Sequence, residues 1–352
     1  MENGRKNGCL KISDDGGKMN VTFLIGNGFD IGVGLHTGYK DFYNVYCKEK
    51  ESDTGIIKHF KADILRDADT WADFESAFGE YAFYLEDEEE YIQLFENFVD
   101  AFSEYLKTEE ESFDETKKEE ILRGMKKALT SYYHIHPADR MPIENLIGQY
   151  NTTFNFITFN YTQCLDKCVE TVQAASNVKE RINGEIGEIV HVHGYTEPDL
   201  IMGVNDSSQI ENEAFSKDST ILNELVKPRQ NQIIRMNYDY NATRVINQSK
   251  IICVYGMSIG ETDKKWWELI MNWLQGNPDR HLIVLKHEAE KRQVFRWRRF
   301  VDRTREYLFM YGGVSSEKRA SLESQIHVDV DRDIFSMDLR KQNHAFVCKS
   351  LL

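Results

Sequence analysis

Several runs of apolar residues end at small or polar positions, which is typical of buried strands in a parallel sheet. The runs that predict strands lie at 21–25, 154–159, 189–193, 251–255 and 281–285, with a short strand at 200–202. Helical patterns follow two of these strands, at 161–172 and 263–274. Strands that alternate with helices predict an α/β fold, in which helices cover both faces of a mostly parallel sheet.

A long stretch from about residue 40 to residue 150 shows the helical period instead. Apolar side chains recur every three or four residues, as in the series Trp71, Phe74, Phe78 and Tyr81. This spacing predicts amphipathic helices, and we assign their aromatic side chains to helix packing rather than to a cofactor site. The stretch is therefore interpreted as a large helical insertion between the first and second strands.

Two further segments are assigned from their polarity. Residues 1–19 contain no apolar core and are expected to form a disordered lead. Residues 204–235 are polar and are expected to form a long loop or mobile segment. The chain has only five prolines and no Pro-rich linker, so residues 20–352 are expected to form a single α/β domain with the helical insertion.

The composition is that of a globular protein, with 41% apolar and 29% charged residues among 352. No run approaches the ~20 consecutive apolar residues of a membrane helix, so no membrane partner is expected. The formal net charge of -15 disfavours broad nucleic-acid binding, which depends on neutralising phosphates. The basic stretch 291–305 is interpreted as a solvated helix face, with an anion or nucleic-acid patch as the alternative.

Six cysteines are scattered along the chain, and none belongs to a Cys-x-x-Cys pair. We therefore expect neither a structural zinc site nor another bound metal. Cys164 and Cys168 are one helical turn apart and are interpreted as small packing residues. Reduced cysteines in this role favour a cytoplasmic location.

The first candidate for chemistry is the turn Gly26-Asn27-Gly28-Phe29-Asp30, which lies between the first strand and a predicted helix. Glycines at such a turn let the backbone approach a phosphate, and a helix start offers free N–H groups. The usual dinucleotide fingerprint has a third glycine at the position that Ile31 occupies here. Ligand binding and a tight structural turn therefore both remain open.

The second candidate follows the strand 154–159, where Thr158, Asn160 and Thr162 form a polar end. In open α/β sheets the ligand crevice lies at the carboxyl ends of the strands. Asn160 can donate and accept hydrogen bonds, so it can hold a water or a ribose hydroxyl without carrying charge. The structural alternative is that Asn160 or Thr162 caps the next helix.

The third candidate is the pair His191 and His193, followed by Gly194. In a strand these two histidines face the same side, and a histidine at a strand end can act as a base near neutral pH. A hydrogen-bonded structural pair is one alternative. A two-histidine metal site is another, but no third ligand lies at a convincing spacing.

The fourth candidate is the segment from Gly256 to Asp263, which repeats the order of strand, small-residue turn and helix. Ser258 and the neighbouring backbone are placed to hold a phosphate or a ribose. The structural alternative is that Thr262 or Asp263 caps the helix, and capping does not exclude ligand contact.

Taken in order, these motifs resemble the bacteriophage abortive infection AbiH family, which belongs to the wider sirtuin-like NAD-binding superfamily. The stretches W-x-D-F-E at 71–75 and MGVND at 202–206 also resemble this family, and the similarity spans roughly residues 20 to 270. The resemblance implies a sirtuin-like, Rossmann-type sheet. The four-cysteine zinc module of sirtuins is missing, which weakens the case for protein deacylation.

Set beside sirtuins, Asn160 is similar to the asparagine of their T-Q-N-I-D motif, and His193 to their catalytic histidine. The resemblance implies NAD-binding roles for Gly26, Asn27, Gly28, Asp30, Thr158, Gly256, Ser258 and Asp263. Asp30 departs from the small residue common in sirtuins, and it is interpreted as a ribose ligand or a helix cap.

The activity that this resemblance implies is an anti-phage NAD hydrolase that releases nicotinamide and ADP-ribose. Asn160 would position the water and the ribose, and His193 would act as the base. The leading alternative is a non-catalytic sensor of NAD or ADP-ribose that switches an oligomer. A toxin that acts on nucleic acid or protein and an ADP-ribosyl transferase are further alternatives. The expected partners are NAD and a second copy or another defence protein.

Overall fold

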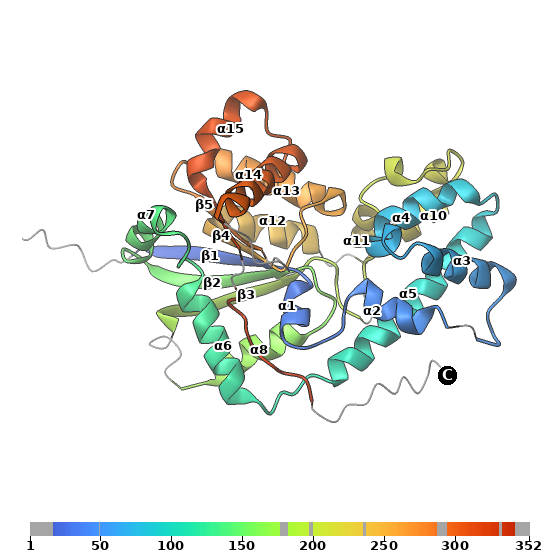
Figure 1. Cartoon of the computed structure of the whole chain (residues 1–352), viewed down its shortest axis with the longest axis horizontal. Coiled ribbons are helices and arrows are strands. Elements are labelled where there is room, and N and C mark those ends of the chain that lie inside the picture. Colours follow the sequence, from blue (N-terminus) through green and yellow to red (C-terminus); the bar gives the residue numbers. More distant parts are fainter. Residues whose placement is uncertain are drawn as a thin grey trace, which may run out of the picture.

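The computed structural model describes residues 17–48, 50–176, 182–196, 200–234, 237–286, 294–330 and 333–341. Six parallel strands form one sheet with the order β3-β2-β1-β4-β5-β6 (Figure 1). Their bounds are β1 Lys18–Ile25, β2 Asn151–Thr158, β3 Gly184–His191, β4 Ser249–Tyr255, β5 His281–Lys286 and β6 Ile326–Val330. This is the strand order of doubly wound dinucleotide-binding sheets. The predicted α/β class with a parallel sheet is confirmed.

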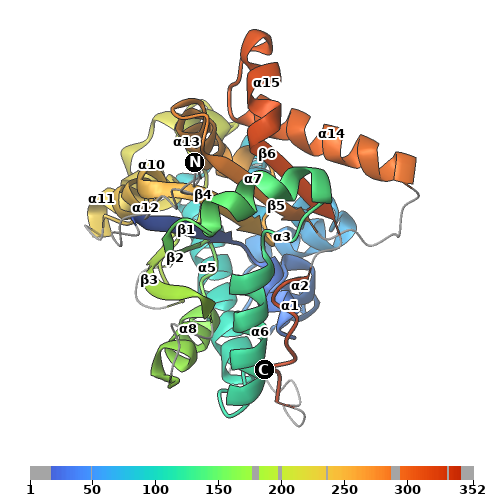
Figure 2. The ribbon, with the colours of Figure 1, turned by 90° about the vertical axis from the view of Figure 1, so that its left-hand side faces the viewer.

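Helices cover both faces of the sheet because its strands are apolar on both sides. In β1, Val21, Phe23 and Ile25 belong to one core, while Leu24 belongs to the other. The first core is closed by α1 (Gly28–Gly32), α6 (Lys118–Ser131), α7 (Pro137–Ile147) and α8 (Cys164–Ala174). The second is closed by α12 (Tyr238–Gln248), α13 (Lys264–Gln275), α14 (Val294–Tyr311) and α15 (Ser316–Leu322). Figure 2 shows the sheet between α8 and α6 on one side and α12 and α13 on the other.

A helical lobe faces the carboxyl ends of the central strands (Figure 1). It contains α2 (Tyr39–Tyr46), α3 (Gly55–Arg66), α4 (Phe74–Tyr81) and α5 (Glu88–Glu111), around a separate aromatic core. Trp71, Phe74 and Phe78 are buried there, which confirms their predicted role in helix packing. The helical segment predicted at about 40–150 is divided, since α6 and α7 pack against the sheet instead.

The prediction of a long loop at residues 204–235 is wrong. The segment contains α10 (Ser219–Leu225) and α11 (Lys227–Ile234), and it completes the core of the lobe. Asp218 caps α10, and this short helix buries Ile221, Leu222 and Leu225. These three residues and the flanking Phe215 and Val226 belong to the lobe core, which holds α10 in place although most of the sequence around it is polar. The short strand predicted at 200–202 is also absent, although its last two residues are buried.

Most of the predicted lead, residues 1–16, lies outside the described residues. The last part of it is ordered, because β1 begins at Lys18 and the Asn151 N–H donates to the Gly17 carbonyl. Within the described residues, no helix is long and apolar enough to cross a membrane. The basic stretch lies largely on α14, where Arg298, Arg299 and Arg303 are exposed, as expected of a solvated face.

Candidate functional site

The sheet brings the four predicted motifs to one edge. The pairing register aligns Ile25 with Thr158 and Tyr255, and Thr158 with His191, so these four strands end in one row. Strands β2 and β3 lie on one side of β1, and β4, β5 and β6 lie on the other side, so the strand order reverses at β1. The crevice of an open α/β sheet lies at such a switch point, outside the carboxyl ends of the strands.

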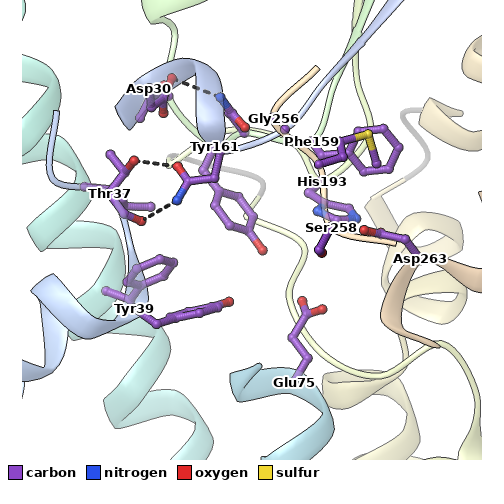
Figure 3. Close-up of a pocket in the computed structure, with 17 residues that line it drawn as sticks. Asp30, Thr37, Tyr39, Glu75, Phe159, Tyr161, His193, Gly256, Ser258 and Asp263 are labelled. Carbon is purple, nitrogen blue, oxygen red and sulfur yellow. Dashed lines mark hydrogen bonds between the residues drawn. The ribbon is translucent and has the colours of Figure 1, made fainter. Parts of the chain in front are cut away.

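A cavity of about 180 Å³ lies at this switch point, between the sheet and the helical lobe (Figure 3). Eight of the ten predicted site residues line it, namely Gly26, Asn27, Asp30, Asn160, His193, Gly256, Ser258 and Asp263. Gly28 and Thr158 do not line it. The lobe supplies the opposite wall through Tyr39, Glu75, Phe102 and Leu106. The site is therefore shared between the sheet edge and the helical lobe.

Asp30 and Asn160 form a buried hydrogen-bonded unit with Thr162. Asn160 Nδ2 donates to Asp30 Oδ1 over 2.9 Å, and Thr162 Oγ1 donates to Asp30 Oδ2 over 2.8 Å. Asp30 is only 1% exposed and Asn160 only 4%. Neither Asn160 nor Thr162 caps α8, whose N-cap is Gln163 without a side-chain cap. The interpretation of Asp30 as a helix cap is also replaced by this contact with the asparagine.

Burial raises the pKa of Asp30 to about 7. The hydrogen bonds from Thr162 and Asn160 oppose this rise, and the nearby Glu110 carboxylate adds to it. The second polar atom of the asparagine, Asn160 Oδ1, is buried and has no hydrogen-bond partner among the described residues. A buried acceptor without a partner is destabilising by about 1–3 kcal/mol, so a hydrogen-bond donor on a ligand in the cavity would relieve this cost.

The two glycine turns pack against each other rather than cradling a phosphate. The Gly28 N–H donates to the Gly256 carbonyl at 2.9 Å, and the Gly26 N–H donates to the Tyr255 carbonyl at 3.0 Å. A Cβ on Gly28 would lie 2.5 Å from Gly256 Cα, and one on Gly26 would lie 2.6 Å from the Gly256 carbonyl oxygen. The tight structural turn, which the sequence left open, accounts for Gly26 and Gly28. Both of their N–H groups are already used, so neither is free to bind a phosphate.

Two other residues that were predicted to bind the ligand, Asn27 and Thr158, have hydrogen bonds within the protein. The Asn27 amide donates to the Thr37 carbonyl at 3.1 Å and accepts from the Thr37 hydroxyl, so both of its polar atoms are occupied. Thr158 is fully buried, and its hydroxyl accepts from the Asn160 N–H at 3.1 Å. Asn27 therefore fixes the segment after α1, and Thr158 fixes the backbone of Asn160.

The two histidines have different surroundings. Strand β3 ends at His191, so the alternation of side chains does not extend to His193. His191 Nε2 lies 2.9 Å from an Asp166 carboxylate oxygen on α8, whereas His193 lines the cavity. Burial lowers the pKa of His193 well below 6.5, and the Lys227 ammonium lowers it further. The imidazole is therefore neutral near pH 7.

A group of carboxyl residues faces the histidine side of the cavity. Figure 3 shows Asp263 and Ser258 close to His193, with Glu75 on the wall that the lobe supplies. The Asp263 carboxylate makes no capping hydrogen bond to α13, and burial raises its pKa to about 6. Glu75 forms a buried ion pair with Lys227, with Oε2 and Nζ 2.8 Å apart.

A comparison with protein-family models shows to which family the chain belongs. The family model described as bacteriophage abortive infection AbiH matches residues 22–284, about three-quarters of the chain. The chain belongs to the AbiH family. Membership indicates a role in abortive infection, a defence against bacteriophage. A comparison with curated proteins found no match.

In this AbiH protein, the residues that sequence reasoning missed come mainly from the helical lobe. Glu75 and Lys227 were not proposed for the site, and the two are 152 positions apart. A signal was present, because Glu75 ends the W-x-D-F-E stretch and Gly203 lies in the MGVND stretch. The Gly203 N–H donates to Glu75 Oε1 at 3.2 Å. Both family-like stretches therefore converge on the carboxylate of one cavity residue.

The MGVND stretch also ties the lobe to the turn after β4. Asn205 Nδ2 donates to the carbonyl oxygens of Glu261 and Thr262, at 3.0 and 2.7 Å. Gly203 has a φ of 134°, a conformation that side-chain-bearing residues rarely adopt. Asn205, in the segment predicted as a loop, therefore contributes to the contacts that hold the two walls of the AbiH cavity together.

Proposed function

We propose that this AbiH protein hydrolyses NAD to nicotinamide and ADP-ribose in the cavity at the switch point. The observation that carries the proposal is the composition of the cavity, where neutral His193 and the partnerless oxygen of Asn160 both lie beside buried carboxyl groups. The strand order supports a nucleotide ligand by analogy with other doubly wound sheets, and it supports a sirtuin-like fold in the same way.

The proposed reaction is a single displacement by water. The bond between the nicotinamide nitrogen and the ribose carbon breaks, and its electron pair goes to nicotinamide, which leaves neutral. The oxygen of water bonds to the ribose carbon and gives a proton to His193, which later releases it to solvent. Asn160 Oδ1 accepts a hydrogen bond from a ribose hydroxyl or from the water. Positioned acid–base groups of this kind typically contribute ~10²–10⁴-fold in rate.

The charge of the cavity supports a cationic reacting group. Asp30, Glu75 and Asp263 contribute three carboxyl groups, and the Lys227 ammonium pairs with one of them, Glu75. The nicotinamide ring of NAD is positively charged, and the ribose becomes oxocarbenium-like as the ring departs. Carboxylates stabilise such a transition state in glycoside hydrolysis. We therefore assign Asp263 and Glu75 to electrostatic stabilisation.

The size of the cavity suggests which half of NAD it holds. At about 180 Å³ it is smaller than the ~300–1,000 Å³ of typical ligand sites. The nicotinamide and its ribose would occupy it, and the phosphates and adenosine would extend past the turn after β4. Ser258 is exposed at this turn and is available for the outer part of the ligand. The glycines at 26 and 28 act through packing in this scheme.

The test is nicotinamide release from NAD by the purified full chain, compared with Asn160→Ala and His193→Ala. Both variants are expected to fold and to lose turnover by ~10²–10⁴-fold. Asn155→Ala is a matched control, because Asn155 is a buried asparagine in β2, the strand that ends just before Asn160, and its side-chain oxygen accepts from the Glu188 N–H. It should retain turnover.

Two results would replace the proposal. Full turnover by both cavity variants would remove Asn160 and His193 from the chemistry. Saturable binding of NAD by titration calorimetry, without nicotinamide release in phage-infected cells or in solution, would indicate a sensor instead of a hydrolase.

A further inference from the structure

The partnerless oxygen of Asn160 raises the question of what fixes the direction of this amide. An asparagine side chain presents an oxygen acceptor on one side and an NH2 donor on the other, and the two orientations occupy the same space. The orientation decides whether the site offers an acceptor or a donor to its ligand. Asp30 is the neighbour that distinguishes the two orientations, because its carboxylate accepts a hydrogen bond from Asn160 Nδ2.

We propose that Asp30 is a positioning residue, whose carboxylate holds the NH2 group of Asn160 and so keeps Asn160 Oδ1 for a ligand donor. The inference rests on the proposed function, in which that donor is a ribose hydroxyl or the attacking water. An ionised carboxylate has only acceptors, so it can bind the NH2 side of Asn160 but not its oxygen.

Two further contacts hold the unit in place. Thr162 Oγ1 donates to the second oxygen of Asp30, and the Thr158 hydroxyl accepts from the backbone N–H of Asn160. Asp30, Asn160 and Thr162 are all at least nine-tenths buried, so solvent does not compete for these hydrogen bonds. A carboxylate that accepts the ring N–H of a metal-binding histidine fixes the orientation of that histidine in the same way.

Substitution by asparagine separates positioning from simple packing. Asp30→Asn keeps the size of the side chain, but its amide can pair with Asn160 in either orientation and still satisfy Thr162. The variant should therefore fold and lose ~3–10-fold in kcat/KM, whereas Asp30→Ala should lose ~10–100-fold. Asp53→Asn is the matched control, since the Asp53 side chain is only 4% exposed and pairs with Lys61 inside the lobe, 2.8 Å away. It should lose stability and keep turnover.

The pH profile gives a readout that a packing role would not move. Only ionised Asp30 fixes the amide, so wild-type turnover should fall as the pH drops through about 7, the pKa of this carboxyl. The charged and titratable groups around it are Glu110 on α5, His191 on β3, and Cys164 and Cys168 on α8. Asp30→Asn should lose the inflection near 7, while Asp263→Asn should retain it.

A second measurement does not depend on any ligand. The side-chain amide signals of Asn160, assigned by their loss in Asn160→Ala, should titrate with a midpoint near 7 in nitrogen NMR spectra of the full chain. The midpoint should vanish in Asp30→Asn. Amide signals that do not respond to Asp30, together with wild-type pH profiles in both Asp30 variants, would overturn the inference. If Asn160→Ala and His193→Ala keep full turnover, the proposed function fails, and the NMR titration still decides the role of Asp30.

Discussion

The two edges of the sheet each carry a buried polar cluster, and the clusters differ in what they leave open. At the carboxyl edge, Asp30, Asn160 and His193 line or support a cavity, and Asn160 Oδ1 has no partner. At the amino edge, His281 Nδ1 lies 3.0 Å from His327 Nε2, and His327 lies 3.6 Å from Asp139. The amino-edge histidines bind each other, and His327 Nδ1 also has no hydrogen-bond partner among the described residues. A buried polar atom without a partner is therefore assigned to a ligand site only where, as at Asn160, its residue lines a cavity.

The largest expected difference between the edges is in catalysis. His193→Gln should lower NAD turnover by ~10²–10⁴-fold, because glutamine cannot accept the proton that the imidazole takes. His327→Gln should keep turnover and lower the free energy of unfolding by about 1–3 kcal/mol, since it disturbs a buried hydrogen-bonded pair. Nicotinamide release and denaturant unfolding of the two variants give both quantities. An equal loss of turnover in both variants would show that the two edges do not differ in their role in catalysis.

The next largest effect concerns ion pairs at the two edges. Lys227→Met leaves Glu75 without its buried partner, so the free energy of unfolding should fall by about 3–5 kcal/mol. Lys250→Met is the control at the amino edge, where the pair with Asp279 is 3.5 Å long and Asp279 is exposed. Its effect should be about 0–1 kcal/mol. Chemical denaturation measures both. A similar loss in the two variants would contradict the difference in burial.

A smaller effect is expected from the packing of the two turns at the carboxyl edge. Gly28→Ala would place a Cβ 2.5 Å from Gly256 Cα, which forces the turns apart and should be destabilising by about 1–3 kcal/mol. Gly260→Ala lies in the same turn region, where an added Cβ meets nothing within 4 Å. Its thermal midpoint should be unchanged. If Gly28→Ala is as stable as Gly260→Ala, the close approach of the turns is not a constraint.

The smallest effect is the pH dependence of stability, which should have opposite signs at the two edges. Burial lowers the pKa of His281 to about 4, so this group weakens the fold as the pH falls from 6.5 toward 4. Burial raises the pKa of Asp30 to about 7, so this group favours the fold below 4 and loses that effect as the pH rises through 7.

The variants His281→Gln and Asp30→Asn should therefore deviate from wild type in opposite directions between pH 4 and 7. Each difference is expected to change by about 1 kcal/mol in the free energy of unfolding per pH unit across this range. Urea titrations at several pH values measure it. Parallel deviations would show that the two clusters do not differ in charge state.

The sequence predicted the sheet better than the lobe, for a physical reason. Central strands such as β1 and β4 are apolar on both faces, so each is visible as a continuous run. Strand β6 has the short alternating sequence IHVDV and was missed. Helices α10 and α11 bury few residues each and depend on contacts with a lobe core built from distant segments. Short elements fixed by such contacts leave little local pattern.

The same limit applies to the site. The positions of Asn160 and His193 at the sheet edge followed from strand ends, because parallel strands end at the same edge. The contact between Asp30 and Asn160 spans 130 residues and could not be predicted from spacing. Gly26 and Gly28 were expected to approach a phosphate, yet it is the Gly256 turn that approaches them. A glycine in the sequence indicates that some group approaches the backbone closely, but it does not show which group that is.

The most direct test of the account is a crystal structure of the His193→Ala variant with NAD. We expect the nicotinamide ribose in the cavity at the switch point, with a hydroxyl group within hydrogen-bond distance of Asn160 Oδ1 and with Asp30 still bound to Asn160 Nδ2. NAD bound elsewhere on the molecule, or Asn160 turned with its NH2 group toward the ribose, would contradict it.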